Sequence, residues 1–175
     1  MCRESVKNLR ANKCDSVTTQ SGYYLWWFNK IAANKLLKPL DMVAAEINKI
    51  PSTKIEENEY WCLYFGISKN LSMRAKWHIM QEHRESAVKH GALSTLRQSL
   101  SALLKKEMSQ SENCINKFMD ENCYWEWHQA SNPEEKEKQE LSSEKKSYPL
   151  NIKGNKTVCK ETRNKLRRCR KEYKK

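Results

Sequence analysis

An arginine and a histidine with helical spacing lie just downstream of an apolar segment in this chain. Arg74 and His78 are four residues apart, so both side chains would project from one face of a helix. The apolar segment carries Tyr64 and then Gly66, and a glycine without a Cβ lets a phosphate or another strand approach the backbone closely. A guanidinium and an imidazole beside a phenol could hold a phosphodiester and transfer protons. These residues are the first candidates for a reactive site.

Three aromatic segments are predicted to be the strands that position these side chains. They cover residues 22–28, 60–67 and 123–127. The second is apolar on both faces, as expected of a central strand that is covered on both sides. Because helical segments separate the three, we expect an α/β (α+β) domain with a small three-stranded antiparallel sheet. Only 4 Gly and 4 Pro argue against a barrel or sandwich rich in tight turns.

The segments between and after these strands are predicted to be mainly helical. Pro39 divides residues 29–50 into two short helices, with Asp41 as a plausible cap for the second, and residues 51–59 read as a loop. Further helices are expected over 71 to about 85, 94–106 and 111–120, in a charged segment that begins at Pro133, and in part of the C-terminal tail.

The chain length of 175 residues favours a single domain. We expect an N-terminal arm over 1–19, a body over 20–155 with a helical insertion at 29–59, and a basic tail over 156–175. The net charge of +12 is uneven, since residues 152–175 carry +9 and the rest of the chain only +3. Such a tail suggests a polyanionic partner, although a solvated tail that aids solubility is the alternative.

Composition also bears on the compartment. No apolar run approaches the length of a membrane span, and the first residues lack the apolar stretch of a signal peptide, so we expect a cytoplasmic protein with no membrane partner. Seven cysteines without a C-x-x-C pair fit reduced thiols. A zinc site of Cys159, Cys169 and a histidine would have the wrong ligand spacing for the common types.

Two tyrosine motifs together with the arginine and histidine resemble the GIY-YIG nuclease family. Gly22-Tyr23-Tyr24 corresponds to the first motif and Tyr64-Phe65-Gly66 to the second. The helix arginine and histidine of that family fall at the eighth and twelfth positions after the second glycine, which are Arg74 and His78 here.

The chain departs from the simple family pattern in two ways. Tyr23 replaces the isoleucine of the first motif, and Tyr24 and Tyr64 are 40 residues apart, far more than a short hairpin requires. The segment at 29–59 is then an insertion. The stretches STLRQSLSALL and YPLNIKGN resemble a bacterial branch of the family that includes restriction-type enzymes, and the resemblance covers roughly residues 20–155.

The resemblance implies hydrolysis of a DNA phosphodiester with one divalent metal. Glu137 would bind Mg²⁺, which offsets charge on the scissile phosphate and the leaving oxygen. Tyr24 would activate the attacking water with its proton drawn toward His78. Arg74 would stabilise the pentavalent transition state, and Tyr64 would orient the nucleophile or the phosphate.

Supporting roles and one ambiguity also follow from the resemblance. Gly66 and Asn151 would brace the site. Glu134, Glu135 and Glu140 compete with Glu137 for the metal, and an ordinary charged helix face would explain all four glutamates. An aromatic strand tyrosine taken alone is most often a core residue. The joint placement of the motif residues is what favours a nuclease site.

Double-stranded DNA is the expected partner, with phosphate contacts from the basic tail. The tail residues expected to bind are Arg163, Lys165, Arg167, Arg168, Arg170 and Lys171. A metal-dependent endonuclease is the leading hypothesis. A catalytically silent nucleic-acid-binding module on the same fold and an interaction protein with an incidental basic tail are the alternatives. A double-strand cut by one small site requires either a homodimer or two sequential nicks, and the sequence leaves this choice open.

Overall fold

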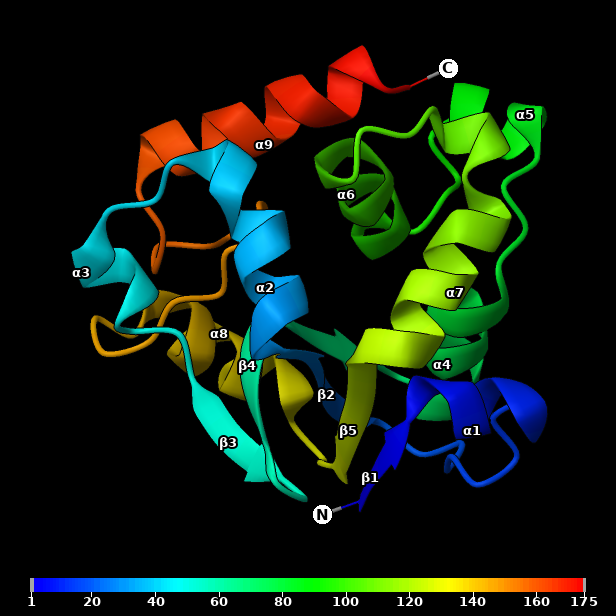
Figure 1. The fold of residues 1–175 in the computed structure, drawn as a ribbon. Helices are drawn as coiled ribbons and strands as arrows, with labels where there is room; N and C mark the ends of the chain where they lie inside the picture. The colour runs from blue at the N-terminus through cyan, green and yellow to red at the C-terminus, as the bar shows by residue number, and fades with distance from the viewer. Residues whose placement is uncertain (1, 175) are drawn as a thin grey trace.

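The centre of the protein is a five-stranded antiparallel sheet with strand order β1-β5-β2-β4-β3 (Figure 1). The structure is a computed structural model that describes residues 2–174. The strands are β1 (Cys2–Ser5), β2 (Gly22–Asn29), β3 (Ser52–Ile55), β4 (Asn58–Ser68) and β5 (Cys123–Gln129). The three predicted aromatic strands are confirmed as β2, β4 and β5, which lie side by side at the centre.

The expectation of a three-stranded sheet was wrong, because β1 and β3 extend it at both edges. Each edge strand has four residues and a mostly polar sequence, so neither shows the aromatic or alternating pattern of a strand. They form because their backbones can pair with the exposed edges of β5 and β4. The predicted loop at 51–59 is therefore largely strand, and the predicted arm at 1–19 contributes β1.

Helices surround the sheet. They are α1 (Val6–Ala11), α2 (Lys30–Leu37), α3 (Ala44–Ile47), α4 (Leu71–Met80), α5 (Glu85–Lys89), α6 (Thr95–Leu103), α7 (Glu112–Asn122), α8 (Pro133–Ser142) and α9 (Lys160–Glu172), with 3₁₀ turns η1 (Lys38–Leu40) and η2 (Met108–Gln110). No helix within residues 2–174 is long and apolar enough to cross a membrane.

Two local helix predictions need correction. Asp41 does not begin a helix, because it adopts a left-handed conformation with φ 47° and ends η1. The predicted helix from Leu71 to about Glu85 is interrupted after Met80, and α5 begins separately at Glu85. The periodic apolar pattern located these helices, but the break between them carries no proline or glycine that would mark it.

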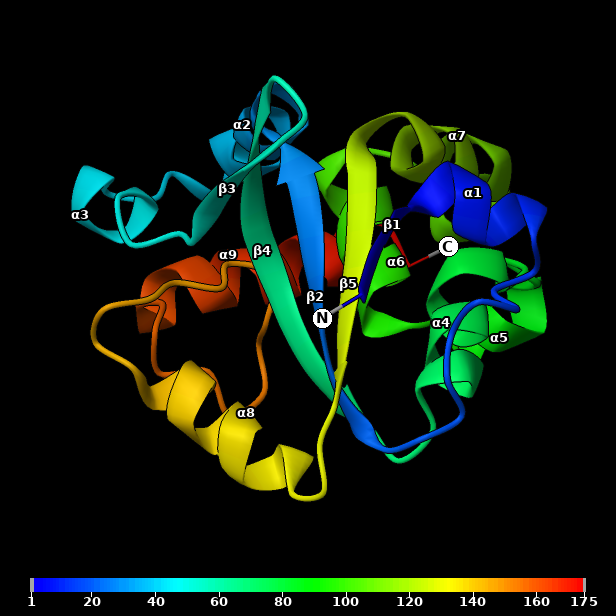
Figure 2. The same ribbon diagram turned by 90° about the horizontal axis from the view of Figure 1, so that it is seen from below.

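The two faces of the central strands pack against different partners. On one face, Tyr24, Trp26 and Phe28 join a large core with residues of α1, α4, α6 and α7. On the other face, Trp27 and Phe65 pack in a smaller cluster under α8 and the segment that follows it. Figure 2 shows α8 and α4 on opposite sides of β2 and β4. Both faces of the central strands are thus buried, as predicted for β4.

The basic C-terminal segment forms α9, which packs along α6 and contacts η1 (Figure 1). Thr162 and Leu166 are buried on its inner side. The Arg170 guanidinium donates a hydrogen bond of 2.8 Å from Nη2 to the Thr95 carbonyl of α6. One face of the basic segment is therefore held against the body of the protein.

Candidate functional site

A buried tyrosine and histidine form the centre of the candidate site. The Tyr24 hydroxyl, from β2, lies 2.9 Å from Nε2 of His78, from α4. Both residues are almost completely buried, with exposed fractions of 2% and 1%. The other ring nitrogen of His78 lies 3.2 Å from the Ser94 hydroxyl at the start of α6. A hydrogen-bonded chain of three side chains thus joins β2, α4 and the N-cap residue of α6.

Burial sets the protonation of this pair. It raises the pKa of Tyr24 well above its usual value, the neighbouring Tyr64 phenol adds to the increase, and Arg74 opposes it. Burial also lowers the pKa of His78 to about 3, with further contributions from Arg74 and Arg97. The phenol and the imidazole are therefore both neutral at pH 7. When Tyr24 donates to Nε2, the phenol proton can pass directly to that nitrogen.

Gly66 makes room for the Tyr24 ring. The two residues are direct partners across β2 and β4. A Cβ at position 66 would overlap the Cζ and hydroxyl oxygen of Tyr24. A larger residue would therefore displace the phenol from His78. The sequence predicted that either a phosphate or another strand would approach Gly66 closely. In the structure it is the neighbouring strand β2, through the Tyr24 side chain.

Tyr64 is the second phenol of the site. It lies in β4, and its ring is stacked on Tyr24 with 6.3 Å between centroids. Its hydroxyl is 3.3 Å from the Thr95 hydroxyl. Unlike Tyr24 it lines an open cavity, so it can contact a bound molecule directly.

Arg74 supplies a positive charge one helical turn before His78. Its side chain is half-buried and forms no ion pair or hydrogen bond with residues 2–174. It lines a hollow of about 630 Å³ together with Met73, Trp77 and Glu134. An arginine without a carboxylate partner beside two phenols is available to an anionic ligand.

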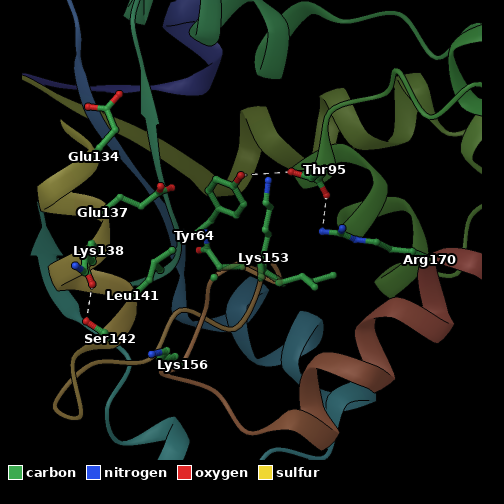
Figure 3. Close-up of a pocket in the computed structure, with 14 residues that line it drawn as sticks. Tyr64, Thr95, Glu134, Glu137, Lys138, Leu141, Ser142, Lys153, Lys156 and Arg170 are labelled. Carbon is green, nitrogen blue, oxygen red and sulfur yellow. Dashed lines mark hydrogen bonds between the residues drawn. The ribbon is translucent and has the colours of Figure 1, made fainter. Parts of the chain in front are cut away.

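A cavity of about 780 Å³ lies on the other side of Tyr64 (Figure 3). Glu137 projects into it from α8 with its carboxylate directed toward the Tyr64 ring. Burial raises the pKa of Glu137, Glu134 adds to the increase, and Lys153 opposes it. A further cation in this cavity would therefore favour the ionised carboxylate.

The structure places the four competing glutamates in different environments. Glu135 is exposed and accepts a 3.2 Å hydrogen bond from the Asn132 side chain at the helix start. Glu140 is buried and is held by Lys146, Lys136 and the Tyr148 hydroxyl. Only Glu134 and Glu137 line the cavity.

Asn151 braces β4 directly behind Tyr64. Its amide oxygen accepts from the Phe65 backbone N–H at 2.9 Å, and its amide nitrogen donates to the Phe65 carbonyl at 2.7 Å. The side chain is buried and continues the strand's backbone pairing. It therefore supports the strand position of Tyr64.

The cavity offers oxygen donors to a cation. No three His, Cys, Asp or Glu side chains gather as a ligand cluster anywhere in residues 2–174. Glu137, Glu134 and the Tyr64 hydroxyl nevertheless line one cavity, and Mg²⁺ takes few carboxylates and keeps several waters. These oxygens are compatible with one hard divalent ion that keeps most of its waters.

Arg97 is an important residue that sequence reasoning missed. It is fully buried in α6, and its Nη1 donates to the His78 carbonyl at 2.9 Å. Its other nitrogens donate to His83 and Asn116. Arg97 thereby fixes the C-terminal end of α4, where carbonyls favour a cation. In the sequence it is one more arginine on an amphipathic helix, and nothing distinguishes it from a solvated one.

We predict that the protein loses stability as the pH falls from about 6.5 toward 4. His78 and His83 are buried and neutral, with pKa values lowered to about 3 and about 4, mainly by burial. Protons then bind the unfolded chain first, below its histidine pKa of about 6.5. The stabilisation is complete above that pH and declines below it by up to about 1.4 kcal/mol per pH unit for each histidine.

Urea unfolding at a series of pH values measures this effect. His83→Gln should give a shallower dependence, because one buried histidine is removed. The exposed His90, changed to Gln, serves as the matched control and should follow the wild-type dependence. A wild-type free energy of unfolding that stays constant from pH 7 to 4.5 would contradict the prediction.

Fold and site together define a small antiparallel-sheet domain in which two phenols and a buried imidazole are in contact, with a guanidinium in one hollow and a carboxylate in a second, neighbouring cavity. The chain matches the family model for the GIY-YIG catalytic domain over residues 22–172. It belongs to this family of nuclease domains. The match includes both tyrosine motifs and reaches through α9. No curated protein and no solved structure matches the chain.

Proposed function

We propose that this protein is a divalent-metal-dependent endonuclease that hydrolyses double-stranded DNA, from the restriction-type branch of the family. The observation that carries the proposal is the buried Tyr24–His78 hydrogen bond, 2.9 Å long, beside Tyr64 and an unpaired Arg74. A buried proton-accepting pair next to a free cation suits attack of water on a phosphodiester.

In this proposal a proton relay activates the attacking water. The Tyr24 oxygen takes a proton from water while its own proton passes to Nε2 of His78. The phenol stays neutral throughout, because burial strongly disfavours a tyrosinate here. Burial also disfavours the imidazolium that forms on His78, so the negative charge that develops on the phosphate has to offset it. The water oxygen bonds to phosphorus as the bond to the leaving oxygen breaks, and the proton on His78 then returns through Tyr24 to reach the leaving oxygen.

The remaining residues manage charge and position. Arg74 holds the scissile phosphate and offsets the charge that grows on it. Glu137 would hold Mg²⁺, which when bound offsets negative charge on the phosphate and leaving oxygen. Tyr64 orients the phosphate or the water, and Asn151 keeps Tyr64 in place through β4.

The basic helix α9 would add affinity through contacts with DNA phosphates. The residues proposed for these contacts are Arg163, Lys165, Arg167, Arg168, Arg170 and Lys171. Arg167 and Arg168 are exposed, whereas Lys165 lies 3.2 Å from the Asp41 carboxylate and would have to exchange that partner for a phosphate. A cut through both strands would require a homodimer or two sequential nicks.

The proposal is tested by incubating the protein with supercoiled plasmid and with fragmented genomic DNA of varied base composition. We expect nicked and then linear plasmid with Mg²⁺ or Mn²⁺, and intact DNA with EDTA. The genomic sample guards against a rare recognition site that the plasmid lacks. DNA binding without cleavage of either sample under any divalent metal would leave a silent nucleic-acid-binding module as the better description.

A further inference from the structure

Four cations line the cavity beside Tyr64, and they are Lys138, Lys153, Lys156 and Arg170. Lys153 and Arg170 are the two at the end of the cavity near Tyr64 and Thr95 (Figure 3). Lys153 comes from the loop after α8, and Arg170 comes from α9. Neither forms an ion pair within residues 2–174. Figure 3 shows Lys153 extending from its loop toward the region of the Tyr64 and Thr95 hydroxyls, with the Arg170 guanidinium on the other side of Thr95. The end of the cavity near Tyr64 and Thr95 is thus positive.

The Arg170 guanidinium is held in place by α6. Its Nε donates to the Ser99 hydroxyl at 2.9 Å, and its Nη2 donates to the Thr95 carbonyl at 2.8 Å. These bonds leave Nη1 without a partner among the described residues, and the side chain lines the cavity. Burial lowers the pKa of Arg170 to about 10, so the group is still charged at neutral pH. A desolvated cation with a free N–H donor favours the binding of an anion.

The loop that carries Lys153 is fixed at both ends. Leu150 N–H donates to the Leu63 carbonyl at 3.0 Å, and Lys156 N–H donates to the Leu141 carbonyl at 2.8 Å. Between them Gly154 turns the chain with φ 70°. The Lys153 backbone is therefore placed before any ligand binds, which reduces the ordering cost of binding.

We propose that Lys153 and Arg170 form a subsite for one backbone phosphate of the DNA strand being cut, adjacent to the scissile phosphate on the Tyr64 side. The inference rests on the proposed function. Arg74 lines a separate hollow and lowers the pKa of Tyr24, whereas Lys153 and Arg170 line the cavity beside Tyr64, and Glu134 borders both hollows. A strand that crosses the tyrosines would then place successive phosphates against Arg74 and against this subsite.

The test measures binding of a mixed-sequence duplex in EDTA over a range of salt concentrations. The variants are Lys153→Met, Arg170→Met and the double variant. Each single change should make the slope of log Kobs against log salt shallower by about 1, because we expect this phosphate to be held only when both cations contact it. The double variant should also be shallower by about 1 and not 2, because both cations hold the same phosphate.

Lys117→Met and Arg84→Met are matched controls for charge removal. Both residues are well exposed, lie outside the cavity, and have acidic neighbours of their own. Because Arg170 is partly buried, Lys153→Met carries the test if Arg170→Met fails to fold. A Lys153→Met slope equal to wild type, or a double variant shallower by about 2, would overturn the shared subsite.

Binding in EDTA separates this inference from the nuclease activity. If the variants show the expected shallower slopes but the wild-type protein cleaves no DNA, the phosphate subsite is supported and the endonuclease is rejected. If the wild-type protein cleaves DNA but Lys153→Met has the wild-type slope, the endonuclease is supported and the phosphate subsite is rejected.

Discussion

Arg74→Ala should lower the rate of DNA cleavage by about a thousandfold. Arg74 is the half-buried cation beside the tyrosine pair, and its side chain has no ion-pair or hydrogen-bond partner among residues 2–174 that would need it for stability. A positioned positive charge at a phosphoryl transition state is worth roughly 10³-fold or more in rate. Single-turnover cleavage with protein in excess measures the chemical step without the effect of DNA affinity.

Two variants of the same helix sharpen this prediction. Arg74→Lys keeps the charge but loses the planar pair of donors, so an intermediate rate is expected. Lys76→Ala removes an exposed charge two residues away, 3.9 Å from Asp15, and should cleave at the wild-type rate. Unfolding of Arg74→Ala should occur at the wild-type urea concentration. Equal cleavage by Arg74→Ala and wild type would remove the arginine from the mechanism.

Glu137→Gln should abolish metal-dependent cleavage, with a loss on the order of 10³-fold or more, because in the proposed mechanism it removes the metal's main protein ligand. Glu137 is the glutamate that combines partial burial, a cavity position and orientation toward Tyr64. Glutamine keeps the size of the side chain while removing the charge. A calorimetric titration with Mn²⁺ in the absence of DNA should show weaker binding of the metal to the variant than to wild type.

The neighbouring glutamates are the controls for this assignment. Glu134→Gln keeps Glu137 and should retain most of the cleavage rate. Glu140→Gln leaves Lys146 and Tyr148 without their buried carboxylate, so it should lower the free energy of unfolding by about 1–3 kcal/mol. Loss of cleavage in Glu134→Gln, with normal cleavage in Glu137→Gln, would show that the metal ligand is Glu134, in the first turn of α8, and not Glu137.

The central strands and the site helix were predictable because their signals are local. An aromatic run identifies a buried strand from its own residues, and Arg74 and His78 share a helix face because of their spacing alone. The edge strands β1 and β3 were not predictable in this way. Their polar four-residue sequences become strands only because β5 and β4 present free backbone groups beside them.

The basic C-terminal segment illustrates a second limit. Its charge was plain from the sequence, and a polyanionic partner was a sound hypothesis. Which of its residues turns toward the cavity depends on the docking of α9 on α6, which brings Arg170 against Thr95 and Ser99. Arg97 is a similar case, since its burial follows from the packing of α4 against α6 and α7.

Residue types and short spacings were sufficient to define the family motifs, the nearly balanced charge of the body with its basic end, and the group of acids from which a metal ligand could come. Those properties are set within single segments, so they do not depend on contacts between segments. The choice of Glu137 over Glu140 as the cavity carboxylate, the Tyr24–His78 hydrogen bond and the space that Gly66 leaves for a phenol required the folded chain. Each depends on the relative position of segments tens of residues apart, which only packing around the common sheet sets.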